Sequence, residues 1–293
     1  FYAISTQGYD DTEDSIQSSP SEQLNDTNVN PYSDETFYYV TADGDAGLRV
    51  QQMVEPTNNA TTIITEFNDY KFHELDEISP GLVGRRWFGN RFDIESDQIY
   101  EFDFPNLVSN SDPMYVVVKA AAASESSTSM AISINGTSVD PLVFNRLSGQ
   151  SVLSTKEFKG EIPASGGSST VTVELSYNNN SNPSSIGYLD YVGIEALRQL
   201  SGVDGQLRFK YNRSKNLSGT GEYQISNASQ FSQVWDVTNA GFISSKQNAT
   251  AASMFSFKAT MGETRKYVAV NPNNYYSPIQ ISQSQISNQN IKG

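Results

Sequence analysis

Short runs in which apolar and polar residues alternate recur along most of the chain. The clearest are residues 100–104, 129–134, 170–177 and 207–211. A period of two is typical of strands with one buried and one solvent-facing side. Residues 115–118 (Tyr-Val-Val-Val) are apolar in every position, which predicts a central strand that is covered on both faces. No stretch shows a helical period over more than two turns, so the pattern predicts an all-β protein.

Turn residues divide these strands into two groups. Asn135-Gly136 follows the alternating run 129–134 and predicts a tight hairpin. After a strand predicted over 188–197 the pattern pauses and restarts, with further short strands expected at 207–211, 234–237, 254–258 and 266–270. Short, evenly spaced strands of this kind favour a jelly-roll/galactose-binding-like β-sandwich, plus a second, smaller β-rich unit.

The sequence therefore predicts three ranges. Residues 61–200 form the sandwich, and residues 201–293 form the smaller unit, which leads towards a peptidase domain outside this chain. Residues 1–60 hold N-terminal strands, among them 37–41 and 48–50, and an acidic loop that packs on a neighbouring unit. Ten acidic residues lie within 1–47, before the first basic residue at Arg49. Asp43 and Asp45 form an oxygen-rich turn that leaves calcium open as a cofactor, although the EF-hand spacing is absent.

Charge and cysteine content exclude several functions. A net charge of −14 argues against nucleic-acid partners, because phosphate binding needs clustered Lys and Arg. The chain has no cysteine, which excludes a thiol nucleophile, a disulfide framework and a Cys-ligated zinc within it. No apolar run reaches the roughly 18–20 residues that a membrane-spanning helix needs. The single histidine, His73, lacks the context of a catalytic triad, and we expect it at a surface or interface.

Residues 81–92 concentrate unusual residue types. They hold three of the nineteen basic residues, one of the two tryptophans and three glycines. We interpret one group of residues here, and one at 235–236, as structural signatures rather than catalytic sites. They are Gly84, Arg85, Arg86, Trp87, Phe88, Gly89, Trp235 and Asp236. Trp87 is expected to be largely buried, with Arg85 or Arg86 paired to an acidic residue.

The order of several short motifs resembles that of a known family. They are Phe1-Tyr2-Ala3, Asn30-Pro31-Tyr32-Ser33 with 37–41, Gly84-Arg85-Arg86-Trp87-Phe88-Gly89 with Phe92, Tyr188-Leu189-Asp190-Tyr191-Val192, Gln206-Leu207-Arg208-Phe209, 234–238, and 288–293. In this order the chain resembles the region upstream of the peptidase domain in PorU-type sortases of the type IX secretion system. These sortases are gingipain-like cysteine peptidases. The family usually carries a histidine near the end of the last motif, where this chain has Lys292.

The resemblance implies a non-catalytic region of a surface sortase, located outside the cell at the outer membrane. The catalytic cysteine and histidine of the family would lie beyond Gly293, so no catalytic residue is expected in this chain. The region would position the peptidase, or contact the C-terminal domains of cargo proteins or components of the secretion system. Two alternatives remain open: a carbohydrate-binding jelly roll, with a glycan as partner, and a calcium-stabilised adhesion module.

Overall fold

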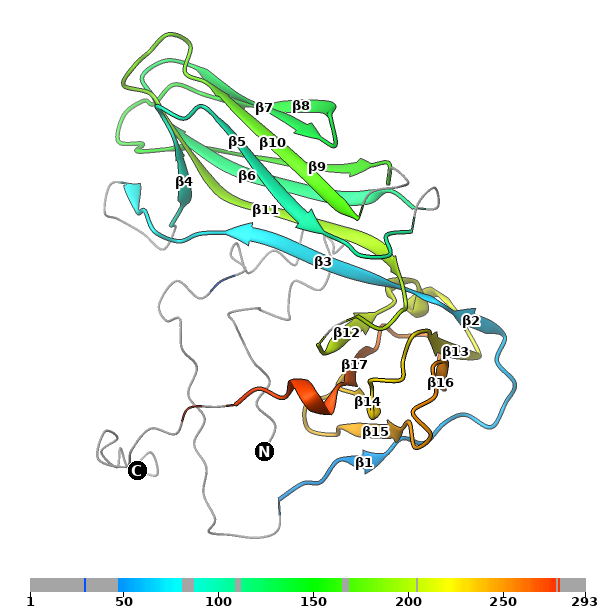
Figure 1. Ribbon diagram of the computed structural model, residues 1–293. Coiled ribbons are helices and arrows are strands. Elements are labelled where there is room, and N and C mark those ends of the chain that lie inside the picture. The colour runs from blue at the N-terminus through cyan, green and yellow to red at the C-terminus, as the bar shows by residue number, and fades with distance from the viewer. Residues whose placement is uncertain are drawn as a thin grey trace, which may run out of the picture.

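The computed structural model describes Val29 and residues 47–80, 87–108, 112–164, 169–203, 205–277 and 279. Within these ranges there is no α-helix, and strands form almost all of the regular structure. Figure 1 shows a β-sandwich above a smaller β unit, with β3 and β11 running from the first towards the second. The predicted class is confirmed: all-β, a sandwich plus a second, smaller β-rich unit.

One layer of the sandwich is the end of a ten-stranded sheet. Its strands, in spatial order, are β3 (Glu66–Glu74), β11 (Ile186–Gln199), β6 (Met114–Ala123) and β9 (Ser154–Ile162), and β4 (Gly89–Phe92) also pairs with β11. Neighbours in this layer are antiparallel. The run 115–118 lies in β6, between β11 and β9, and is largely buried on both faces as predicted.

The other layer is a four-stranded antiparallel sheet. Its order is β5 (Asp97–Asp103), β10 (Thr170–Asn178), β7 (Thr128–Ile134) and β8 (Thr137–Phe144). Asn135 and Gly136 join β7 to β8 with φ angles of 48° and 75°, the left-handed pair that a type I′ hairpin needs. Alternate residues of these strands face β6 and β11 and form one apolar core, as the period of two predicted.

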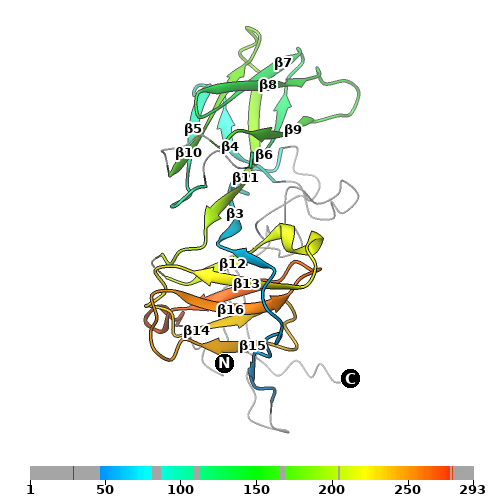
Figure 2. The same ribbon diagram turned by 90° about the vertical axis from the view of Figure 1, so that its right-hand side faces the viewer.

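The smaller unit is a second β-sandwich (Figure 2). Its first layer continues the ten-stranded sheet through β12 (Leu207–Lys210), β17 (Lys266–Val270), β14 (Gln233–Asp236), β15 (Ser244–Gln247) and β1 (Gln51–Gln52). Its second layer has three strands: β16 (Phe255–Thr260), β13 (Thr220–Ile225) and β2 (Thr62–Ile64). Two short 3₁₀ helices are η3 (Asn212–Asn216) and η4 (Pro272–Asn274).

Aromatic rings fill the core of the smaller unit. Phe209, Tyr223, Phe257 and Tyr267 are buried, with ring centroids between 4.8 and 6.3 Å apart. Burial raises the pKa of the Tyr223 hydroxyl to about 12, and it raises the pKa of Tyr267 as well. Packed aromatics of this kind supply much of the apolar area that so small a unit can bury.

The N-terminal part of the described chain contributes to the smaller unit. β1 pairs with β15 and β2 pairs with β13, both in parallel, before β3 enters the larger sandwich. The strand predicted over residues 48–50 is wrong, because these residues have no regular structure; among the described residues the first strand starts at Gln51. The predicted strand over 37–41 lies outside the described residues, and the division at residues 60 and 200 stays a prediction.

Candidate functional site

The predicted signature at 84–89 is only partly described. Gly84, Arg85 and Arg86 lie outside the described residues, and so does the ion pair expected for one of these arginines. Phe88 is completely buried, whereas Trp87 is only partly buried. Phe88 exchanges two backbone hydrogen bonds of 2.8 Å with Ile78, and its ring lies 6.1 Å from that of Tyr188. The buried aromatic plug is therefore Phe88, because neighbouring residues in an extended segment point to opposite sides.

Gly89 is required by a close backbone approach. A Cβ atom at this position would lie 2.3 Å from the Leu75 Cβ atom and 2.6 Å from the Leu75 carbonyl oxygen. Gly89 also pairs with Leu189 of β11 at the start of β4. The glycine thus allows the segment after β3 to cross directly against β4.

The second signature, Trp235-Asp236, lies in β14 of the smaller unit. The Asp236 carboxylate accepts a hydrogen bond of 2.9 Å from the Arg265 guanidinium and one of 3.0 Å from the Thr238 amide. Arg265 also forms an ion pair with Glu263. The Asp236 carboxylate thus holds the turn at Thr238 and the segment at Arg265 in place, which is a structural role.

The sequence left calcium open as a ligand of the turn at Asp43 and Asp45, and it predicted that His73 lies at a surface or interface. Asp43 and Asp45 lie outside the described residues, and calcium at that turn stays a prediction. Within the ranges described above, no three His, Asp or Glu side chains are grouped so that they could hold a metal ion. His73 is half-buried: its Nε2 atom lies 2.7 Å from the Asn90 Oδ1 atom, and its ring centroid lies 4.7 Å from that of Tyr100.

A polar network joins the two units where the ten-stranded sheet passes from one to the other. Lys210 of β12 pairs with Asn68 of β3. The Glu195 carboxylate of β11, which is 1% exposed, accepts hydrogen bonds from Asn68 Nδ2 at 3.2 Å and Asn212 Nδ2 at 2.9 Å. The Asn212 backbone amide in turn donates to Asn68 Oδ1 at 3.0 Å. Buried polar groups that are hydrogen-bonded in this way favour one relative arrangement of the elements they connect.

Arg198, near the end of β11, lies at the same junction and is 4% exposed. Its Nη1 atom lies 2.6 Å from the Asp69 carboxylate, and its Nε atom donates to the Pro105 carbonyl at 2.7 Å. Its guanidinium carbon lies 5.1 Å from the centre of the Phe67 ring. The Nη2 atom is buried and has no hydrogen-bond partner. A guanidinium nitrogen in this state can donate to an oxygen atom brought in by a ligand.

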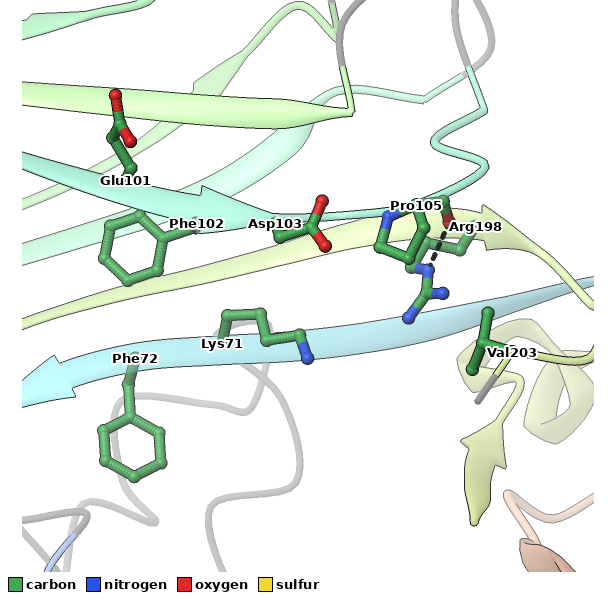
Figure 3. Close-up of a pocket in the computed structure, with 8 residues that line it drawn as sticks. All are labelled: Lys71, Phe72, Glu101, Phe102, Asp103, Pro105, Arg198 and Val203. Carbon is green, nitrogen blue, oxygen red and sulfur yellow. Dashed lines mark hydrogen bonds between the residues drawn. The ribbon is translucent and has the colours of Figure 1, made fainter. Parts of the chain in front are cut away.

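Arg198 lines an open pocket of about 740 Å³ between β3 and β5. The residues that line it are Lys71, Phe72, Glu101, Phe102, Asp103, Pro105, Arg198 and Val203. Figure 3 shows the Lys71 side chain extending along β3 towards the Arg198 guanidinium, with Glu101 and Asp103 on β5. The pocket is therefore lined by two basic side chains, Lys71 and Arg198, while the exposed Glu101 carboxylate points away from them on β5, and this pocket is the candidate functional site.

The sequence did not reveal this pocket. Its residues come from four separate segments, and none of them carries a motif. The alternation in 100–104 did place Glu101 and Asp103 on the solvent-facing side of a strand, which is correct. No signal in the sequence brings Arg198 to Asp69 or to Pro105.

The fold defines a class of protein: an all-β protein built from β-sandwich units. This chain has no cysteine and so is not itself a cysteine peptidase. Within the described residues no helix has the length and apolar character needed to cross a membrane. No protein-family model and no curated protein sequence matches the chain.

Among solved structures, the chain resembles a portion of dimeric latent PorU from Porphyromonas gingivalis. The TM-score is 0.63 at 16% identity, and the match covers 76% of this chain but 22% of that chain. Smaller likenesses include the CBM36-1 domain of a multidomain xylanase from the hindgut metagenome of Trinervitermes trinervoides (TM-score 0.29, 13% identity, 43% of this chain and 96% of that chain). A family 35 carbohydrate-binding module from an environmental isolate gives a TM-score of 0.28 at 11% identity over 46% of this chain and 97% of that one.

Proposed function

We propose that this chain is a non-catalytic β-sandwich region of a surface cysteine-peptidase sortase of PorU type. The observation that carries the proposal is the fold match to latent PorU, which extends over 76% of the chain and so includes more than one sandwich. The matched region makes up 22% of the PorU chain, so that a peptidase activity of the whole protein is something we propose and not something the match shows.

The role we assign is to position the peptidase and to contact protein partners outside the cell, at the outer membrane. The partners proposed are the C-terminal domains of cargo proteins or components of the type IX secretion system. A shared sheet and the Glu195–Asn212 hydrogen bond across the junction support such a role, because they hold two units as one body. Calcium and glycan binding stay predictions from the sequence.

The first test is the gene itself. The proposal expects the reading frame to continue into a peptidase domain that carries a catalytic cysteine and histidine. A frame without such a domain on either side of this region would refute it.

The second test uses the full-length protein in its own host. Replacing residues 61–293 by a flexible linker should abolish removal of C-terminal sorting domains from secreted cargo, as seen on immunoblots of surface fractions. A matched strain with only the catalytic cysteine replaced sets the level of complete loss. Normal cargo processing without residues 61–293 would show that the region does not support the peptidase.

A further inference from the structure

The side of the sandwich next to the pocket is an open sheet edge. Among the described residues, β5 pairs with β10 alone and is the first strand of its sheet. The Phe104 amide donates to Ser169, and the Tyr177 amide donates to Ser96, so the even-numbered residues of β5 bond to β10. In an antiparallel ladder the odd-numbered residues then direct their amides and carbonyls away from β10, towards the free edge.

The pocket opens beside this edge and contains hydrogen-bond donors. The Arg198 Nη2 atom is buried and unpartnered, although the other two guanidinium nitrogens are bonded to Asp69 and Pro105. Within the described residues Lys71 forms a long ion pair of 3.9 Å with Asp69, and its side chain is 44% exposed. An extended segment lying along β5 would bring carbonyl oxygens, the acceptors that Arg198 and Lys71 lack.

The charges on the edge strand β5 determine which extended segments would bind there favourably. Glu101 and Asp103 are exposed, and neither forms an ion pair within the described part of the chain. Their cross-strand neighbours on β10, Thr172 and Thr170, are uncharged. Two unpaired carboxylates beside the pocket favour a basic side chain in the bound segment and disfavour an acidic one.

We propose that the β5 edge and the junction pocket bind an extended polypeptide segment that carries a basic side chain. The segment adds to β5 as a further strand, its basic side chain meets Glu101 and Asp103, and one of its carbonyl oxygens accepts from Arg198. This inference rests on the proposed function, in that it gives the protein contact a place and a chemical preference.

Fluorescence anisotropy on the 293-residue chain tests it with defined peptides. The probe is an acetylated, amidated peptide of alternating Thr and Val with one central Lys, seven residues long to match β5. The same peptide with a central Glu is the matched comparison. We expect the Lys peptide to bind about tenfold more tightly than the Glu peptide, with the difference shrinking at high salt.

Variants locate the binding. Combining Glu101→Gln with Asp103→Asn should remove the preference for Lys, while Glu161→Gln, an exposed carboxylate on the edge strand β9, should leave it intact. Ile99→Pro removes an outward amide without breaking the β10 ladder and should abolish binding of both peptides. Arg198→Lys should weaken both peptides about tenfold. Because Glu101 and Asp103 are exposed, their variants keep the test decisive even if Arg198→Lys fails to fold.

Three results would overturn the inference. One is equal affinity for the Lys and Glu peptides. Another is self-association of the Glu101→Gln, Asp103→Asn variant with unchanged peptide affinity, which would show that these charges only protect a sheet edge. The third is displacement of the Lys peptide by a xylo-oligosaccharide, which would make the pocket a glycan site. Each of these would leave the proposed function standing if cargo processing still requires residues 61–293.

Discussion

The network at the junction predicts how strongly the two units depend on each other. Asn212→Ala removes the 2.9 Å hydrogen bond from Asn212 Nδ2 to the buried Glu195 carboxylate, which then keeps its 3.2 Å bond from Asn68. A hydrogen bond to a charged group contributes about 1.5–3 kcal/mol net. We therefore expect the free energy of unfolding to fall by about 2 kcal/mol, which lowers the melting temperature by roughly 4–8 °C when the two units unfold together as one body of roughly 150–250 residues. Asn216→Ala, an exposed asparagine of the same 3₁₀ helix, should change stability by less than about 0.5 kcal/mol.

The two tryptophans allow the units to be followed separately. Trp87 precedes β4 of the larger sandwich, and Trp235 lies in β14 of the smaller unit. Urea unfolding of Trp87→Phe and Trp235→Phe backgrounds, followed by fluorescence, reports on one unit at a time. Asn212→Ala should lower the midpoint that both tryptophans report. If only the Trp235 transition moved, or if Asn216→Ala cost as much, the network would not couple the two units.

Three further outcomes follow from the packing. Phe88→Ala should cost about 3–5 kcal/mol because the ring is completely buried, and Trp87→Ala should cost clearly less; equal losses in urea unfolding would contradict this assignment. Gly89→Ala should lower stability by about 1–3 kcal/mol, because its Cβ atom would lie 2.3 Å from that of Leu75, and an unchanged melting temperature would disprove the close approach. Burial raises the pKa of Tyr223 to about 12, so the stability it contributes is complete below its unfolded pKa of about 10 and is lost as the pH rises towards 12. Alkaline unfolding should shift to higher pH in Tyr223→Phe, and an unaltered pH profile would argue against that contribution.

Alternation was enough to predict the strands whose two faces differ. Residues 129–134 and 170–177 show a clean period of two in sequence and the same period in burial. Within 81–92 we predicted that Trp87 is largely buried, but it is only partly buried and Phe88 is the completely buried aromatic. Neighbouring residues of an extended segment face opposite sides, and the sequence does not determine which of the two faces the core. The smaller unit was predicted in outline, and its parallel partners β1 and β2 were missed because they are very short and lie far away in sequence.

The candidate site could not be predicted for a different reason: its position depends on an irregularity in β11. The pairing of β11 with β6 shifts register between Leu189 and Tyr191, where the other edge of β11 changes its partner from β4 to β3. Leu189 faces the sandwich core before this bulge, and Val192 and Ile194 face it afterwards, so the inward side changes from odd to even residues. Arg198 is an even residue.

Arg198 therefore lies on the inward side of β11 near its end, where the core stops and the pocket begins. Glu195, an odd residue, lies on the opposite face and reaches the smaller unit instead. Reading the strand with one uninterrupted period would exchange these two charged residues, because a shift by one residue moves every later side chain to the other face. The bulge thus determines which of these two residues lines the pocket and which one couples the two units.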